Sequence, residues 1–221
     1  MAHRSPQSPT IGHVSPSYDR LKAALDRYVA AVALAVMAPL LLILAWAVRR
    51  DGAAALFRQT RAGKDGRPFT LLKFRTMKPD VRPFGDSPQS GDDPRITPVG
   101  RWLRETSLDE LPQLINILRG EMSLVGPRPL YLQQVGEWDA RQRRRLLVRP
   151  GLTGLAQIHG RGSLTLEDKL EWDVRYTDCV SLRRDLGIIW HTIRRLWRTG
   201  GDIYETRYSN TRIRRSGELP D

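Results

Sequence analysis

The segment YVAAVALAVMAPLLLILAWAV, residues 28–48, contains no charged side chain. As a helix that rises 1.5 Å per residue it is about 32 Å long, enough to cross the hydrocarbon core of a bilayer, which is about 30 Å thick. A helix in the core of a soluble protein rarely stays uncharged over such a length. The segment therefore predicts a helix embedded in a membrane, around which the rest of the chain is arranged.

Two features of this segment bear on how the helix sits in the membrane. A spanning helix carries its excess of Lys and Arg on the cytoplasmic side, but here cations flank both ends: Arg20, Lys22 and Arg27 before it, and Arg49, Arg50 and Arg58 after it. Pro39, preceded by Ala38, removes the hydrogen bond to the carbonyl of Ala35 and kinks a helix. We expect a re-entrant helix that enters and leaves by one leaflet and breaks at Ala38 and Pro39; a kinked spanning helix fits the same residues.

The composition restricts the class of partner. The chain has 221 residues, 40% of them hydrophobic, and a net charge of +12 with a pI near 10.6. Such a charge favours an anionic partner, which could be a phosphate compound, an anionic lipid or a nucleic acid. Cys179 is the single cysteine, so an internal disulfide is excluded and a reducing compartment is expected. The four histidines are too dispersed for a zinc site.

The pattern along the chain predicts four regions. They are a disordered leader rich in Ser and Pro (1–17), the re-entrant membrane helix region (18–50), a cytosolic catalytic domain (51–200) and a basic C-terminal tail (201–221). Runs at Ala55–Gln59 and Pro68–Phe74, joined by a turn at Ala62–Arg67, predict a small β-hairpin. Helices are expected at about 98–105, 110–119, 131–147 and 165–177. The fold class is α/β, mostly helical.

Residues 182–199 form an amphipathic pattern, with Leu, Ile and Trp on one face and arginines on the rest. This pattern is typical of a surface helix packed on the core. It is equally typical of an interfacial helix that lies along the membrane surface.

Asp109 and Glu110 are adjacent carboxylates within GRWLRETSLDELPQL, residues 100–114. Ser107 and Glu110 satisfy a capping box, so a helix cap is the plain interpretation. Pro112 weakens it, because a helix begun at Ser107 would use the N–H that proline lacks. With Arg104 upstream, an ionised carboxylate could instead attack phosphorus, and its neighbour could hold Mg²⁺.

Three other cations are candidates for binding phosphate or nucleotide. Arg128 lies between two prolines that stiffen the backbone on both sides of it. Lys73 and Arg75 alternate at the end of the predicted hairpin and so point to one face. For each, a surface cation in solvent is the alternative. We interpret Arg143–Arg145 as a solvated helix face or a contact with lipid headgroups, and RPGLTGLAQ, residues 149–157, as a turn that either approaches a ligand or is structural.

Four segments occur in an order that resembles the bacterial sugar transferases, the monotopic polyprenyl-phosphate phosphoglycosyl transferases. They are KFRTM (73–77), DPRITPVGRWLRETSLDELPQL (93–114), MSLVGPRPL (122–130) and RPGLTGLAQ (149–157). The resemblance extends from about residue 18 to about residue 199 and is to the compact form of the family.

The resemblance implies a role for each motif. Asp109 matches the nucleophile, and Glu110 matches its partner in a dyad that binds Mg²⁺, so both are also expected as metal ligands. Arg104 resembles the arginine that faces the phosphate, and Arg128 matches the Pro-Arg-Pro motif that holds the nucleotide. The family's apolar segment is re-entrant and often breaks at Ser-Pro, where this chain has Ala38 and Pro39.

The resemblance also implies the reaction and its place. A sugar 1-phosphate would pass from a UDP-sugar to polyprenyl (undecaprenyl) phosphate through a covalent aspartyl intermediate, with release of UMP, on the cytoplasmic face of the bacterial inner membrane. This step initiates exopolysaccharide, O-antigen, capsule or glycoconjugate synthesis. No nucleic acid partner is expected, because no nucleic-acid-binding motif is present. The alternative is a membrane-tethered basic protein that binds nucleic acid or anionic lipid; the sugar and the oligomeric state stay open.

Overall fold

The computed structural model describes residues 15–50, 52, 54–81, 88 and 90–196. Residues 1–14 of the predicted leader and the predicted tail at 201–221 lie outside the described residues. The described elements are α1 (Pro16–Arg49), β1 (Leu56–Ala62), η1 (Lys64–Gly66), β2 (Pro68–Phe74), α2 (Pro98–Glu105), η2 (Leu108–Glu110), α3 (Gln113–Leu118), β3 (Ser123–Val125), η3 (Leu132–Glu137), η4 (Gln142–Leu147), β4 (Gly151–Thr153), α4 (Leu155–His159), η5 (Arg161–Ser163), α5 (Leu166–Asp178) and α6 (Leu182–Leu196). The predicted fold class, mostly helical with a small hairpin and a long apolar N-terminal helix, is confirmed.

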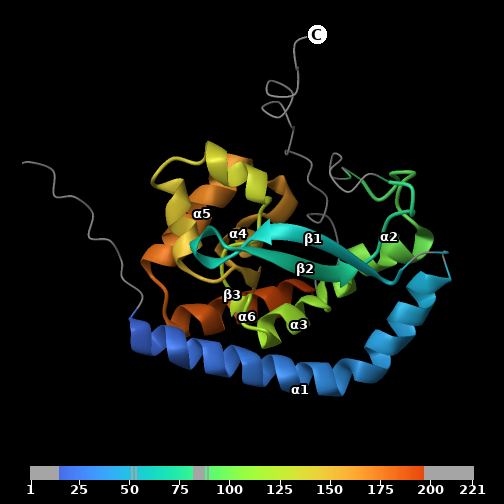
Figure 1. Cartoon of the computed structure of the whole chain (residues 1–221), viewed down its shortest axis with the longest axis horizontal. Coiled ribbons are helices and arrows are strands. Elements are labelled where there is room, and N and C mark those ends of the chain that lie inside the picture. Colours follow the sequence, from blue (N-terminus) through green and yellow to red (C-terminus); the bar gives the residue numbers. More distant parts are fainter. Residues whose placement is uncertain (1–14, 51, 53, 82–87, 89, 197–221) are drawn as a thin grey trace, which may run out of the picture.

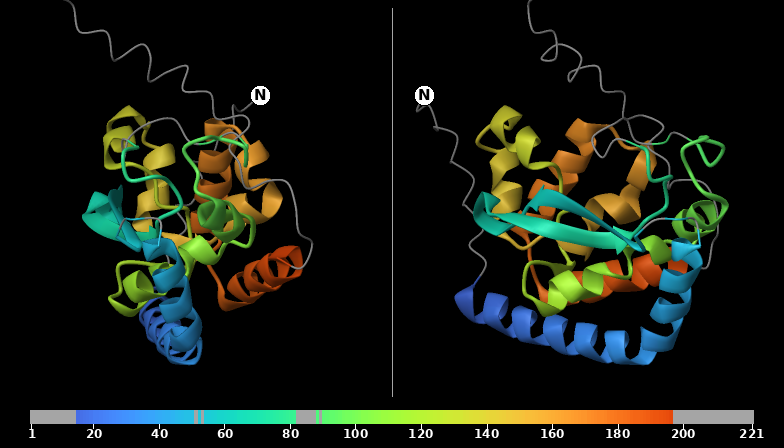
Figure 2. Two further views of the ribbon diagram at one scale, coloured as in Figure 1. Left: turned by 90° about the vertical axis from the view of Figure 1, so that its right-hand side faces the viewer. Right: turned by 45° about the vertical axis from the view of Figure 1, so that its right-hand side comes forward.

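In Figure 1 the hairpin of β1 and β2 lies with α1 and α3 on one side and α5 on the other, and the left view of Figure 2 shows the hairpin at one edge of the molecule. The two strands pair antiparallel from Leu56 opposite Phe74 to Ala62 opposite Pro68. The turn between them uses Asp65 and Gly66 in the left-handed region. Asn116 of α3 joins the helix to β2, because its amide accepts from the Leu72 N–H at 3.0 Å and donates to the Thr70 carbonyl at 2.7 Å.

Helix α1 contains the predicted membrane segment and has Pro39 inside it. In Figure 1 the helix runs along the base of the molecule, and its C-terminal part then turns up toward α2. A proline inside a helix removes a hydrogen bond and produces such a kink. Only 11% of its most apolar stretch is buried, so α1 is not the core helix of a soluble protein.

The two parts of α1 pack on different apolar clusters of the same body. Before Pro39, Ala30 packs with residues of β2 and α3 such as Leu71 and Ile117. After Pro39, Leu44 and Val48 pack in a cluster that includes Phe74 and Leu103. Both ends of the apolar segment therefore contact one globular unit, and the kink allows the helix to follow its surface.

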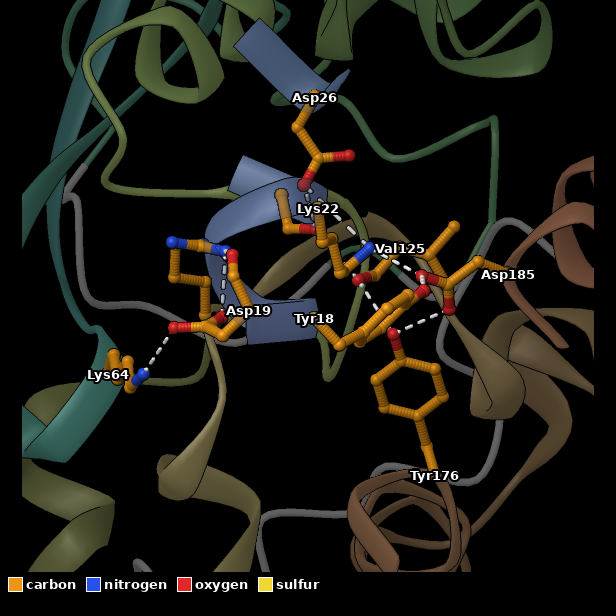
Figure 3. A network of polar contacts seen from close by, with 10 residues as sticks. Tyr18, Asp19, Lys22, Asp26, Lys64, Val125, Tyr176 and Asp185 are labelled. Atoms are coloured by element: carbon orange, nitrogen blue, oxygen red, sulfur yellow. Dashed lines mark hydrogen bonds and ion pairs between the residues drawn. The ribbon is translucent and has the colours of Figure 1, made fainter. Parts of the chain in front are cut away.

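A buried polar network fixes the start of α1 to the body (Figure 3). The Asp185 carboxylate, at the start of α6, accepts from the Lys22 ammonium at 2.6 Å, the Tyr18 hydroxyl at 3.1 Å and the Tyr176 hydroxyl at 2.7 Å. One turn along α1, Asp26 accepts from the Ser123 hydroxyl of β3 at 2.6 Å. Lys22, Asp26 and Asp185 are all buried, so the network joins α1, β3, α5 and α6 with little exposure to water.

Helix α6 turns an apolar stripe outward. Leu182, Leu186, Trp190 and Ile193 are exposed at helical spacing, whereas Asp185 and Ile188 face the body. In both views of Figure 2, α6 lies on the same side of the hairpin as α1, whose outer face is also apolar. A helix with polar contacts inward and apolar side chains outward favours the interfacial interpretation over simple packing on the core. Residues 197–199 of the predicted helix lie outside the described residues.

Three local predictions were wrong. The helix expected at 110–119 begins only at Gln113, because Leu108–Glu110 form a separate 3-10 turn. The helix expected at 131–147 is two 3-10 helices, η3 and η4, separated at residues 138–141, where the Asp139 carboxylate and the Gln142 amide each bond the other's backbone N–H. The expected solvated face at Arg143–Arg145 contains Arg145, which is 3% exposed.

The network at Asp185 makes a prediction about stability. Asp185→Ala should lower the free energy of unfolding by about 3 kcal/mol or more, because it leaves the buried ammonium of Lys22 without its nearest carboxylate. Chemical unfolding of the protein in detergent measures this loss. Glu171→Ala is the control, since Glu171 pairs with Arg141 and Arg175 at the surface and should cost less than about 1 kcal/mol. An equal loss of unfolding free energy in the two variants would show that the buried network stabilises the fold no more than a surface ion pair does.

Candidate functional site

A cavity of about 250 Å³ opens between the hairpin, the η2 turn, the segment after β3, and the α4–α5 region. One face of the hairpin lines it, because Gln59, Leu71 and Lys73 alternate onto the same side of the two strands. Among the described residues, nine basic and three acidic side chains line the cavity. The cavity therefore favours an anionic ligand.

All six predicted site residues line this cavity: Lys73, Arg75, Arg104, Asp109, Glu110 and Arg128. They come from the end of the hairpin, from α2, from η2 and from the segment after β3, which are far apart in sequence. Arg101, which also precedes the dyad, instead pairs with the exposed Asp92. The predicted membrane break, Ala38 and Pro39, lies inside α1 and not at the cavity.

The turn that holds the two carboxylates is not a helix cap. Ser107 precedes it with φ of 58°, in the left-handed region, and makes no side-chain cap hydrogen bond. The capping box, which was the alternative to a functional dyad, therefore does not form. Instead the Ser107 hydroxyl accepts from the Arg161 guanidinium at 3.3 Å. Arg161 itself has φ of 46°, so the site contains two contacting residues in a conformation that is costly for residues other than glycine.

Asp109 is 8% exposed, and its environment disfavours the charged form. Burial and the adjacent charge of Glu110 raise its pKa to about 6, against opposing contributions from Lys73, Arg104 and Arg128. The sequence predicted a carboxylate kept ionised by arginine and a helix N-terminus. The structure differs, because the dyad lies in a 3-10 turn and burial outweighs the nearby cations.

Glu110 and Lys73 respond differently to the same burial. Burial opposes ionisation of Glu110, but the charge of Arg128, the hydrogen bond from it at 2.8 Å and the charge of Lys73 together hold the pKa of Glu110 below its usual value. Burial lowers the pKa of Lys73, although Asp109 and Glu110 counteract this effect. At neutral pH the cavity therefore contains two anionic carboxylates among cations.

Arg128 is held by its backbone as well as by its flanking prolines. The guanidinium of Arg145 donates to the Arg128 carbonyl at 2.5 Å and to the buried Asp173 carboxylate at 2.6 Å. On the other side, Gly126 bonds the Thr153 carbonyl, and a Cβ on Gly151 would lie 2.1 Å from the Gly126 nitrogen. The glycines of RPGLTGLAQ thus serve close backbone packing that places Arg128.

Arg104 is placed by contact between α2 and the end of the hairpin. Its Nε donates to the Thr76 hydroxyl at 2.8 Å. A Cβ on Gly100 would lie 2.1 Å from the Thr76 carbonyl oxygen, so only glycine permits α2 to approach this closely. The KFRT segment therefore holds Arg104 beside the dyad as well as contributing Lys73 and Arg75.

The sequence analysis missed several residues that line the cavity. Arg161 and Lys169 add positive charge. Gln157 adds a neutral amide and Asp173 a carboxylate. The guanidinium of Arg61 stacks on the ring of Tyr131, 3.7 Å from its centroid. No periodicity singles them out, because they reach the cavity through the packing of α4, η5 and α5. The sole local signal was the glycine on each side of Arg161.

The donor set at the dyad fits a hard cation that is shared with a substrate. Within the described ranges there is no cluster of three or more His, Cys, Asp or Glu side chains that could hold a metal ion. Mg²⁺ is commonly held by one or two carboxylates together with substrate phosphates and water. Asp109 and Glu110 supply two such carboxylates.

An exposed apolar helix beside a cationic cavity with paired carboxylates defines a membrane-associated enzyme whose site suits an anionic substrate. The chain belongs to the bacterial sugar transferase family, whose sequence model matches residues 17–199. The family therefore favours the transferase interpretation over the alternative of a basic binding protein.

Several relatives have named activities. A UDP-glucose:undecaprenyl-phosphate glucose-1-phosphate transferase from Caulobacter vibrioides is 46% identical over 193 residues, which cover 79% of this chain and 69% of that protein. The exopolysaccharide production protein ExoY from Rhizobium meliloti is 39% identical over 213 residues, 87% of this chain and 94% of that protein. An undecaprenyl-phosphate glucose phosphotransferase from Komagataeibacter xylinus is 42% identical over 191 residues. The chain spans only 35% of that last protein and 40% of a Haemophilus influenzae sugar transferase.

The raised pKa of Asp109 makes a prediction about stability. Its folded value is about 6 and its ordinary value 3.8, so the penalty for the charged form is fully present above about pH 6 and vanishes below 3.8. Asp109→Asn should therefore raise the free energy of unfolding by on the order of 2 kcal/mol at about pH 7.5 in EDTA, with less gain as the pH falls toward about 4. Chemical unfolding at the two pH values tests this. Asp92→Asn, at an exposed carboxylate, is the control, and a destabilised Asp109→Asn at neutral pH would contradict the prediction.

Proposed function

We propose that this transferase moves a sugar 1-phosphate from a UDP-sugar to polyprenyl phosphate through a covalent intermediate on Asp109, and releases UMP. The observation that supports this most strongly is a buried carboxylate next to a second one in a cavity whose charged lining residues are mostly cations. The names of the relatives from Caulobacter and Komagataeibacter, which refer to undecaprenyl phosphate and glucose, support the same substrates.

The reaction has two steps at one carboxylate. An Asp109 oxygen attacks the β-phosphorus of the UDP-sugar, the bond from that phosphorus to the bridging oxygen breaks, and UMP leaves with the electron pair. An oxygen of polyprenyl phosphate then attacks the same phosphorus and breaks its bond to Asp109, which regains its charge. The product is a polyprenyl-diphosphate sugar, and the two substrates use the site in turn.

The cations of the cavity bind the diphosphate and stabilise the leaving nucleotide. Thr76 orients the guanidinium of Arg104, and Glu110 orients that of Arg128, whose backbone is held by Arg145. Charge that grows on the leaving phosphate is stabilised most by donors that are in place beforehand. Arg161, Lys73 and Arg75 contribute further positive charge at the same cavity.

Asp109 and Glu110 would hold Mg²⁺ together with the diphosphate. When bound, the cation screens the repulsion between the anionic carboxylate and the anionic substrate. Arg128 keeps Glu110 ionised and therefore available as an oxygen ligand.

The membrane arrangement brings the site to the lipid substrate. We propose that α1 is re-entrant from the cytoplasmic face, with its kink at Pro39. Both halves of α1 pack on the same body, and this packing supports a re-entrant helix over one with its ends on opposite sides of a bilayer. The outward apolar side chains of α1 and α6 would lie in one leaflet, with the cavity above them.

The covalent step is tested by release of UMP. Asp109→Asn should lose at least about three decades of UMP release from UDP-glucose in the presence of undecaprenyl phosphate and Mg²⁺, which is about 4 kcal/mol of barrier. Without the lipid acceptor, the wild-type protein should release one UMP per active site and gain the mass of a hexose phosphate, and Asp109→Asn should do neither.

Folding of the variant is checked separately, because Asp109→Asn is expected to be at least as stable as the wild type. UDP-galactose serves as a second donor in case the sugar differs. Turnover of Asp109→Asn within tenfold of the wild type would remove Asp109 from the mechanism.

The re-entrant topology is tested by labelling with a membrane-impermeant thiol reagent. Single cysteines at Ser17→Cys and Ala54→Cys, in a Cys179→Ser background, should be protected in intact cells and react after permeabilisation. Ser17 lies in the first turn of α1 and Ala54 follows the helix, and the proposed arrangement places both positions on the cytoplasmic side of the membrane. Labelling of Ser17→Cys from outside intact cells would show that the helix spans.

A further inference from the structure

Gln157 is buried at the wall of the cavity with its hydrogen-bonding groups unused. Its side chain lines the cavity and the residue is 7% exposed. Within the part of the chain that the structure describes, neither its amide nitrogen nor its amide oxygen has a hydrogen-bond partner. A buried amide of this kind is costly, so native proteins nearly always satisfy it.

Two other buried amides of the described residues have hydrogen-bond partners. Asn116 bonds two backbone groups of β2 and the Glu121 carboxylate. The Gln134 oxygen accepts from the Tyr131 N–H at 3.0 Å. Gln157 differs from both, and it also differs in facing the cavity in which the substrate is proposed to bind.

Contacts from other elements fix the backbone around Gln157, so the position of its side chain at the cavity wall is defined. Arg195 of α6 donates to the carbonyls of Gln157 and Ile158 at 3.3 and 3.0 Å. At the start of α4, a Cβ on Gly154 would lie 2.2 Å from the Gly126 oxygen, so the helix is packed directly on the segment that leads to Arg128.

Asp173 contributes a second unused group to the same wall. Its Oδ2 accepts from Arg145 at 2.6 Å, and its Oδ1 is buried without a hydrogen-bond partner among the described residues. Asp173 also lines the cavity. A carboxylate oxygen repels phosphate and accepts from hydroxyl or N–H groups, so this wall suits a neutral part of a ligand.

We propose that Gln157 and Asp173 form a subsite for the uncharged hydrogen-bonding part of the nucleotide sugar. This rests on the proposed function, which supplies the ligand. The amide offers a donor beside an acceptor, and Asp173 offers another acceptor. Two parts of a UDP-sugar complement such a set: the imide edge of the base and the hydroxyls of the sugar. The phosphates bind at Arg104, Arg128 and Lys73, which come from other elements than α4 and α5.

The test is Gln157→Met, which keeps the length of the side chain and removes both hydrogen-bonding groups. Binding of UDP-glucose, UDP-galactose and UMP is titrated by calorimetry in an Asp109→Asn background, so that the donors are bound and not cleaved. Of the two UDP-sugars, we consider the one that the Asp109→Asn parent binds. We expect Gln157→Met to lower the affinity for it about tenfold, as for the loss of a hydrogen bond to a neutral group. A parallel fall for UMP assigns the subsite to the base, and an unchanged UMP affinity assigns it to the sugar.

Thermal unfolding of the ligand-free protein separates binding from structure. Gln157→Met should leave the midpoint unchanged or raise it, because an unpaired buried amide is removed. The control is Gln142→Met, which lies outside the cavity and should bind as the parent does. UDP-sugar affinity of Gln157→Met within threefold of the parent, or a lowered midpoint, overturns the subsite alone. If the parent binds none of the three ligands, both the subsite and the proposed function are overturned.

Discussion

Two adjacent carboxylates lie in the cavity with little access to water, and the surrounding elements are arranged so that cations offset their repulsion. Like charges withdrawn from water oppose each other's ionisation. Glu110 is kept ionised chiefly by Arg128, while Asp109 keeps a pKa raised to about 6. The cations that offset this come from β2, α2, the segment after β3 and η5. The buried dyad can therefore stay charged only because elements distant in sequence pack around it.

The membrane helix and the cavity belong to one continuous structure. The start of α1 is bound through Lys22 and Asp26 to α6 and to β3, and β3 leads directly to Arg128. The end of α1 packs with Leu103 of α2, the helix that carries Arg104. A displacement of α1 from the body would therefore disturb both arginines, which links the position of the protein in the membrane to the geometry of the site.

Local patterns in the sequence predicted the parts of the structure that depend on local physics. The second strand, α2 and the position of Pro39 within a long apolar helix follow from alternation, apolar periodicity and the missing proline N–H. The six site residues were predicted to share one site because their motifs together resemble a family. The spacing of the residues alone did not require it. Arg145, Arg161 and Gln157 could not be predicted in this way, since each acquires its role from burial and from contacts made by other elements.

Several unfavourable features of this protein lie at the cavity. Ser107 and Arg161 adopt left-handed conformations in contact with each other, Asp109 is charged against its environment, and Gln157 and Asp173 bury unused hydrogen-bonding groups. Each costs stability in the folded protein, whereas the polar network around Asp185 is satisfied. Such costs persist in a fold when the groups concerned gain their partners from a ligand. The proposed substrate has a diphosphate that pairs with the cations and a neutral end that bonds Gln157 and Asp173. Its binding would remove several of these costs at once, so the same groups would contribute free energy to both binding and catalysis.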